Sequence, residues 1–98
     1  MAVSRQVAVP KSKFRYNVEL IGVKNGSNTN FTTPEKFVQL GNIVIEVFRN
    51  GAGPLKLGAT DDYTVSESGG VGTGYDTITY NGPAPLSWEY LSANYIAE

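Results

Sequence analysis

Few residues of this chain could carry out acid–base or nucleophilic chemistry. The 98-residue sequence contains no histidine and no cysteine, so Ser-His-Asp and Cys-His arrangements and thiolate metal sites are excluded. The remaining acid–base candidate is the adjacent carboxylate pair Asp61 and Asp62. Neighbouring residues of a strand point to opposite faces, which is a poor geometry for acting on one substrate. Capping of a turn or strand start is the favoured interpretation, and the sequence predicts a protein without enzymatic activity.

Two other patterns match ligand sites only in part. Asp61, Asp62 and Glu67 could offer oxygens to calcium, but no Asp-x-Asp-x-Asp run is present to make their oxygens converge. The glycine-rich stretch 69–74 lies before a predicted strand, whereas a dinucleotide-binding loop follows a strand and opens a helix. We therefore predict no metal site and no cofactor, and a hairpin loop that its glycines allow to bend.

Aromatic side chains form the largest set of potential binding residues. The six tyrosines and one tryptophan are Tyr16, Tyr63, Tyr75, Tyr80, Tyr90, Tyr95 and Trp88. Such side chains stabilise packing across strands, dominate subunit interfaces or form stacking platforms for sugars. The sequence leaves these roles open. It predicts Trp88 and Tyr90 as the candidate aromatic contacts.

Turn residues divide the chain into short segments with strand patterns. The predicted strands are 14–20, 42–49, 63–66, 75–80 and 88–96, with shorter β-prone stretches at 30–33 and 55–57. In the first strand, Phe14, Tyr16, Val18 and Leu20 are expected on one face. A brief helical turn is expected over 34–38, because a proline there could occupy the first helical position.

The strongest predicted strand, 42–49, is apolar on both faces. Ile43, Ile45 and Val47 would point one way, and Val44 and Phe48 the other. We expect such a strand to be covered on both sides, by a layer of the same chain or by a neighbouring subunit. The pair Asn50-Gly51 then predicts a type I′ turn, in a loop longer than the minimum.

About six to eight short strands at turn spacings of roughly 8–12 residues are typical of an all-β antiparallel sandwich, Ig-like or jelly-roll-like. A small barrel is the alternative, disfavoured because the strands are short and the turns vary in length. The chain length allows one domain. We assign it to residues 14–98 and expect residues 1–13 to form an extended N-terminal arm.

The expected arm is basic and could bind a partner. The net charge of −1 divides into +4 over the first fifteen residues and −5 over the remainder, so the arm could dock on an acidic neighbour, including another copy. The alternative is a solvated terminus. The predicted contact residues of the arm are Val3, Arg5, Val7, Val9, Lys11 and Lys13.

Other partner classes are disfavoured. A net charge of −1 argues against a nucleic-acid partner. No apolar run approaches the ~20 residues of a membrane span, so no membrane partner is expected. No signal-peptide pattern is visible, and the absence of cysteine favours assembly inside a cell.

The motifs also carry a resemblance to a known family. They are Phe31 to Pro34, Asn50-Gly51, Leu55 to Gly58, Asp62 to Val65, Thr77 to Tyr80 and Leu91 to Tyr95, within a region of about two thirds of the chain. Their order resembles small β-sandwich modules of tailed-bacteriophage virion proteins, which occur in minor capsid, head-decoration, neck and tail or fibre proteins. The chain departs from the pattern at Leu86–Glu89, where a Gly-Asp turn is expected.

The resemblance implies an assembly role rather than a catalytic one. We expect a multi-copy virion structural protein, a capsid decoration or minor capsid protein, that stabilises the particle through its arm and sheet edges. Its expected partners are other virion proteins and copies of itself, with assembly in the bacterial host cytoplasm. The alternatives are a neck or tail/fibre component, or a carbohydrate-binding β-sandwich module.

Overall fold

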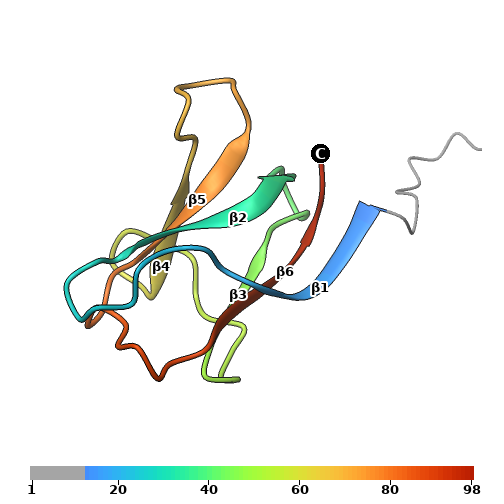
Figure 1. Ribbon diagram of the computed structural model, residues 1–98. Coiled ribbons are helices and arrows are strands. Elements are labelled where there is room, and N and C mark those ends of the chain that lie inside the picture. Colours follow the sequence, from blue (N-terminus) through green and yellow to red (C-terminus); the bar gives the residue numbers. More distant parts are fainter. Residues whose placement is uncertain (1–12) are drawn as a thin grey trace, which may run out of the picture.

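The computed structural model describes residues 13–98, which fold into two antiparallel three-stranded sheets (Figure 1). This confirms the predicted all-β sandwich. The predicted arm residues Val3, Arg5, Val7, Val9 and Lys11 lie outside the described residues.

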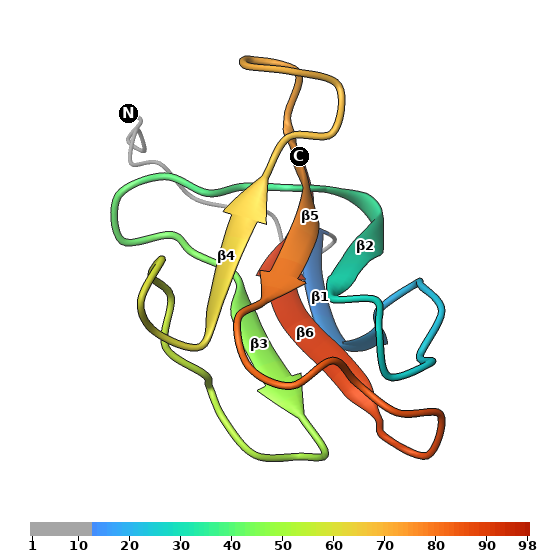
Figure 2. The ribbon, with the colours of Figure 1, turned by 90° about the vertical axis from the view of Figure 1, so that its left-hand side faces the viewer.

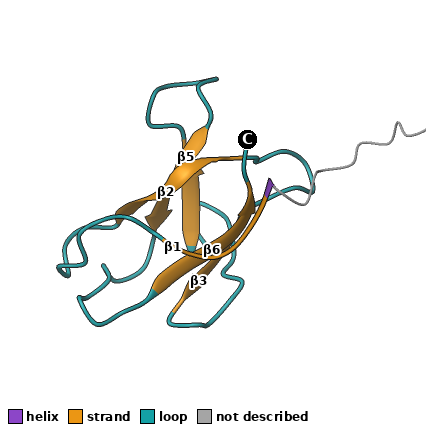
Figure 3. Ribbon diagram, turned by 45° about the vertical axis from the view of Figure 1, so that its right-hand side comes forward, coloured by secondary structure: helices purple, strands orange, loops and turns teal. Residues whose placement is uncertain are grey.

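Six strands build the two sheets. In chain order they are β1 (Phe14–Glu19), β2 (Asn30–Phe37), β3 (Glu46–Arg49), β4 (Tyr63–Ser66), β5 (Tyr75–Tyr80) and β6 (Leu91–Ile96). One sheet has the order β1-β6-β3 and the other β2-β5-β4. Figure 2 shows β4 and β5 in front of β3 and β6, and Figure 3 shows that loops connect the strands.

The core lies between the sheets and follows the two-residue period of strands. Leu91, Ala93 and Tyr95 of β6 are all buried, as the alternation predicts. The largest side chains with less than 2% of their surface exposed include Phe31, Phe37, Ile45, Ile78, Leu91 and Val47. Burying one such side chain contributes roughly 1.5–3 kcal/mol, so this apolar layer holds the sheets together.

The prediction that Phe14, Tyr16, Val18 and Leu20 share one face is wrong. In β1, Phe14 and Tyr16 are exposed, whereas Val18 packs against the core and Leu20, just after the strand, is buried. The register with β6 shifts by one residue between Arg15 and Val18, which marks a β-bulge. Each extra residue moves the following side chains to the opposite face, so the bulge separates the two pairs.

The predicted helical turn over residues 34–38 is also wrong, because β2 continues through this segment to Phe37. Phe31, Thr33 and Phe37 are all buried, so burial outweighs the local preference for a helix start. The register between β2 and β5 shifts between Thr32 and Phe37. This irregular stretch accommodates Pro34, which cannot donate to a regular ladder.

Strand ends differ from the prediction where local hydrogen bonds intervene. The backbone amide and carbonyl of Ile43 pair with those of Leu40 in a tight turn, so β3 begins only at Glu46. Residues 55–57 form no named strand, although Leu57 makes an isolated bridge to Tyr63. The bounds of β4 and β5 match the predicted ranges.

The turn after β3 has the predicted chemistry but is tighter than expected. Asn50 and Gly51 both adopt positive φ, 54° and 81°, as a type I′ turn requires. The amides of Arg49 and Ala52 each donate to the other residue's carbonyl at 3.0 Å. The hairpin loop therefore has only two residues, and beyond it the amide of Leu55 still donates to the carbonyl of Val47 at 2.8 Å.

Candidate interaction surface

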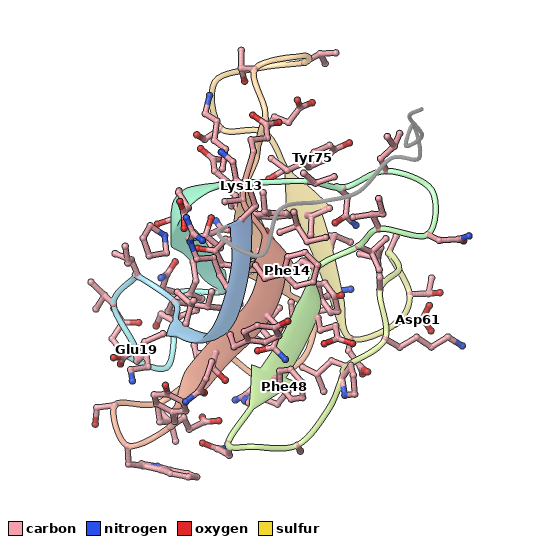
Figure 4. All side chains as sticks on the ribbon, turned by 90° about the vertical axis from the view of Figure 1, so that its right-hand side faces the viewer. Lys13, Phe14, Glu19, Phe48, Asp61 and Tyr75 are labelled. Atoms are coloured by element: carbon pink, nitrogen blue, oxygen red, sulfur yellow. The ribbon has the colours of Figure 1, made fainter. Side chains whose placement is uncertain are left out.

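One face of the molecule presents aromatic and apolar side chains to solvent. We call it the outer face; it is the side of sheet β1-β6-β3 that points away from β2-β5-β4. It comprises Phe14, Tyr16, Val44, Glu46, Phe48, Tyr90, Asn94 and Ile96. Phe14 is 37% exposed, Tyr16 68% and Val44 43%. Figure 4 views this sheet from outside and labels Phe14 on β1 and Phe48 on β3.

Two shallow hollows mark the outer face. The first, of about 240 Å³, is lined by Phe14, Tyr16, Val44, Glu46, Asn94, Tyr95 and Ile96. The second, of about 280 Å³, is lined by Asn17, Phe48, Gly51, Tyr90, Ser92 and Asn94. Asn94 lines both hollows, so they adjoin at β6, and we call the two together the depression. Each is large enough for one or two aliphatic side chains.

The β-bulge of β1 builds this face. Asn17 adopts φ 52°, a conformation that asparagine tolerates better than most residues. Its backbone N–H donates to the side-chain carbonyl of Asn94 at 2.7 Å, which compensates for the interrupted ladder. The bulge keeps Phe14 and Tyr16 on the outer face while Val18 joins the core.

Glu46 gives the outer face a negative charge. Its carboxylate accepts a hydrogen bond from the Asn94 amide at 3.3 Å. Within residues 13–98, no lysine or arginine forms an ion pair with Glu46. The depression therefore combines apolar walls with one carboxylate that could accept a cation from elsewhere.

A second exposed feature is the loop between β5 and β6, which carries Trp88. Trp88 is 72% exposed, although the next residue, Glu89, has a side chain only 5% exposed. The Arg49 guanidinium donates to both oxygens of Glu89, at 2.5 and 2.9 Å. Asn50 and the backbone N–H of Leu86 donate to the same carboxylate at 3.1 and 2.8 Å.

We call this arrangement the Glu89 clamp. Hydrogen bonds from Arg49, and next from the Leu86 amide, lower the pKa of Glu89 to about 2. Lys24 donates to the backbone carbonyl of Glu89 at 2.6 Å. The clamp thus fixes the loop from two sides next to Trp88, whose indole lies in solvent. It lies at residues 86–89, where a Gly-Asp turn was expected from the sequence.

The two sheets are joined at one edge by a polar contact. The inward-facing Arg15 of β1 donates to Glu35 of β2 at 2.6 Å, and the Tyr95 hydroxyl donates to Glu35 at 3.2 Å. The hydrogen bond from Arg15 is the main cause that lowers the pKa of Glu35. Burial, and next the Glu35 charge, raise the pKa of Tyr95 to about 12.

The acidic residues considered as calcium ligands have local structural contacts instead. Asp62 accepts from the backbone of Lys56 at 2.8 Å, and Asp61 lies 3.8 Å from the Lys56 ammonium group. Glu67 accepts from the amides of Gly72 and Gly74 and so orders the glycine-rich loop. Among residues 13–98, no three acidic side chains group into a metal site.

The structure assigns the aromatic residues to different roles. Tyr63, Tyr80 and Tyr95 are buried in the core, and burial raises the pKa of Tyr63 and Tyr80. Tyr16 and Tyr90 belong to the outer face, whereas Trp88 lies on its own loop.

The structure describes no helix in residues 13–98 that could cross a membrane.

Sequence reasoning missed part of the outer face. It named Trp88 and Tyr90, both exposed, and Lys13, whose ammonium group donates to the carbonyl of Glu98 at 3.1 Å. It did not single out Phe14 or Asn94. The sequence did contain one signal for the outer face. The predicted strand 42–49 is apolar on both faces, which placed Val44 and Phe48 on the side away from the core.

Comparisons with known proteins do not assign the chain to a family. No protein-family model, no curated protein and no solved structure matches the chain significantly.

Proposed function

We propose that this protein is a non-enzymatic assembly protein that binds its partners through the outer face of sheet β1-β6-β3. The observation that carries the proposal is the uncovered state of that face. The segment around Val44 and Phe48 has the composition of a strand covered on both sides, yet Val44 is 43% exposed. Within residues 13–98, no second layer of the chain covers it. A neighbouring protein would supply this cover.

The hollows fit this role because protein interfaces concentrate aromatic side chains around a desolvated centre. Tyr16 and Tyr90 supply rigid rings, and Asn94 supplies a polar group between them. The finer proposal is a multi-copy capsid decoration or minor capsid protein of a tailed-bacteriophage virion, with a neck or tail/fibre component as the alternative. It is supported by the motif order from Phe31 to Tyr95 and by the sandwich fold.

The test is the copy number of the chain in purified virus particles, together with its mass in solution. Quantitative mass spectrometry of particles from the virus that encodes the chain should find many copies per particle. The variant Tyr16→Asp should be incorporated less, whereas Val71→Asp should be incorporated normally, because Val71 is fully exposed on the glycine-rich loop. Absence of the chain from particles would refute the virion proposal.

Carbohydrate binding is the second candidate function, and it rests on Trp88. An indole that is 72% exposed, on a loop that the Glu89 clamp fixes, offers a surface for stacking on a sugar ring. A glycan array should then give hits that Trp88→Ala abolishes and Tyr16→Asp leaves unchanged. An array without hits, or binding that Trp88→Ala does not affect, would eliminate this candidate.

A further inference from the structure

We infer that the outer face binds the N-terminal segment of a second copy of the same chain, residues 3–9. The inference deepens the proposed assembly role and rests on it, because it names the partner that the outer face receives. It starts from the shape and charge of the depression along β6. Its apolar walls, from Phe14, Tyr16 and Val44, surround a space of about 240 Å³ next to Glu46.

The N-terminal segment has the complementary chemistry. Residues 1–12 contain Arg5 and Lys11 and no acidic residue. In an extended chain the odd positions share one face, which places Val3, Val7 and Val9 beside Arg5. Side chains two positions apart are about 7 Å apart along a strand. Successive valines are therefore suited to the two adjoining hollows, and Arg5 to the carboxylate of Glu46.

Charge favours the N-terminal segment, rather than the outer face of another copy, as the partner of the depression. Two outer faces in contact would bring two Glu46 carboxylates toward one interface, and like charges in such a place are costly. The segment 3–9, whose single charge is the positive one of Arg5, neutralises Glu46 instead. Asn94 and Asn17, which border the hollows, could offer polar contacts to the backbone of the segment.

Reach makes a second copy accessible. Twelve extended residues span up to about 40 Å, and the segment continues from Lys13, whose carbonyl accepts a hydrogen bond from Ala97 at 2.8 Å. Phe14, the next residue, already lines the first hollow. Mutual exchange of segments would close a dimer, and one-way exchange would build a ring or a filament.

The experiment is a mixing test on full-length protein, read by sedimentation velocity over a concentration series. Wild-type chain should self-associate, and Val7→Asp, which alters the segment, should weaken association roughly tenfold or more. Tyr16→Asp, which alters the hollow, should do the same. An equimolar mixture of the two variants should associate, because one supplies an intact hollow and the other an intact segment. Val71→Asp should behave as wild type.

Circular dichroism of each variant checks folding, and Val44→Asp replaces Tyr16→Asp if the latter is unfolded. The pair Arg5→Glu and Glu46→Lys provides a second arm: each alone should weaken association, and the double variant should recover it. A wild-type chain that stays monomeric would overturn the inference. Unchanged association in either single-site variant would also overturn it. A mixture that does not associate would overturn it as well, and it would indicate insertion into the same copy or contact between two outer faces.

The two proposals fail separately. If the mixing test succeeds but the chain is absent from particles, segment exchange stands and the virion function falls. If the chain is abundant in particles and its incorporation is unaffected by Val7→Asp, the function stands and segment exchange falls.

Discussion

The substitution Glu89→Gln should destabilise the protein in a pH-dependent way. It removes one charge from a carboxylate that is almost fully buried and receives four hydrogen bonds, two of them from Arg49. Glutamine keeps a carbonyl acceptor, but it leaves the half-buried guanidinium of Arg49 without its counter-charge. Breaking one side of such a pair costs more than the pair contributes, because the remaining charge stays poorly solvated.

The size of the effect follows from the pKa. A folded-state pKa of about 2 against the ordinary 4.5 corresponds to at most about 3 kcal/mol of stability at neutral pH. Because the pKa is lowered on folding, this contribution is complete above the unfolded-state pKa and is lost as pH falls through 4.5 toward 2. We therefore expect Glu89→Gln to cost about 2 kcal/mol at neutral pH and progressively less in acid.

Urea unfolding followed by far-ultraviolet circular dichroism, at several pH values, measures this difference. The single tryptophan, Trp88, adds a local signal, since its fluorescence should report loosening of the loop in the variant before global unfolding. Glu19→Gln is the matched control: Glu19 is 60% exposed and 3.9 Å from Lys24, so it should change stability by less than about 0.5 kcal/mol. The stabilising role of the Glu89 clamp would be refuted if Glu89→Gln lowered the free energy of unfolding no more than Glu19→Gln does, or by an amount that does not vary with pH.

Three further predictions concern the core and the sheet edge. Phe37→Ala should lower the free energy of unfolding by about 3–5 kcal/mol in urea titrations, because this ring is completely buried. Gly22→Ala would place a methyl group 2.4 Å from the Phe31 ring and should cost about 1–3 kcal/mol in the same titrations; Gly82→Ala, where nothing lies within 4 Å, should be close to neutral. Glu35→Gln should cost less than about 1 kcal/mol, since its side chain is 38% exposed, and a larger loss would show that this ion pair contributes more than its exposure implies.

Local sequence signals correctly predicted the strands whose apolar and polar residues alternate in agreement with their burial in the structure. In β5, Ile78 between threonines and the flanking tyrosines give a strand in isolation, and the bounds were predicted correctly. In β2 the local signal was misleading, because a threonine followed by Pro34 is typical of a helix start. The burial of Phe31 and Phe37, which depends on β5 and β6, decided the outcome instead.

The candidate site was harder to predict because distant partners create it. The positive φ of Asn17 is compensated by Asn94, 77 positions away, so no window around Asn17 signals the bulge. The clamp likewise joins Glu89 to Arg49 across 40 positions. Sequence patterns located Trp88 and Tyr90, but they could not reveal that the loop of the first is fixed by a buried carboxylate and that the second borders a hollow.

The bulge at Asn17 lets the face pattern of β1 survive a change in the length of the strand. Removing Asn17 would restore strict alternation with β6, and Phe14 and Tyr16 would still lie on the face opposite Val18. An in-frame loss of that one codon would therefore keep the outward and inward halves of the strand as they are. Chains of this kind could differ in length at this point and still present the same binding surface, a relationship that comparisons based on substitutions alone would overlook.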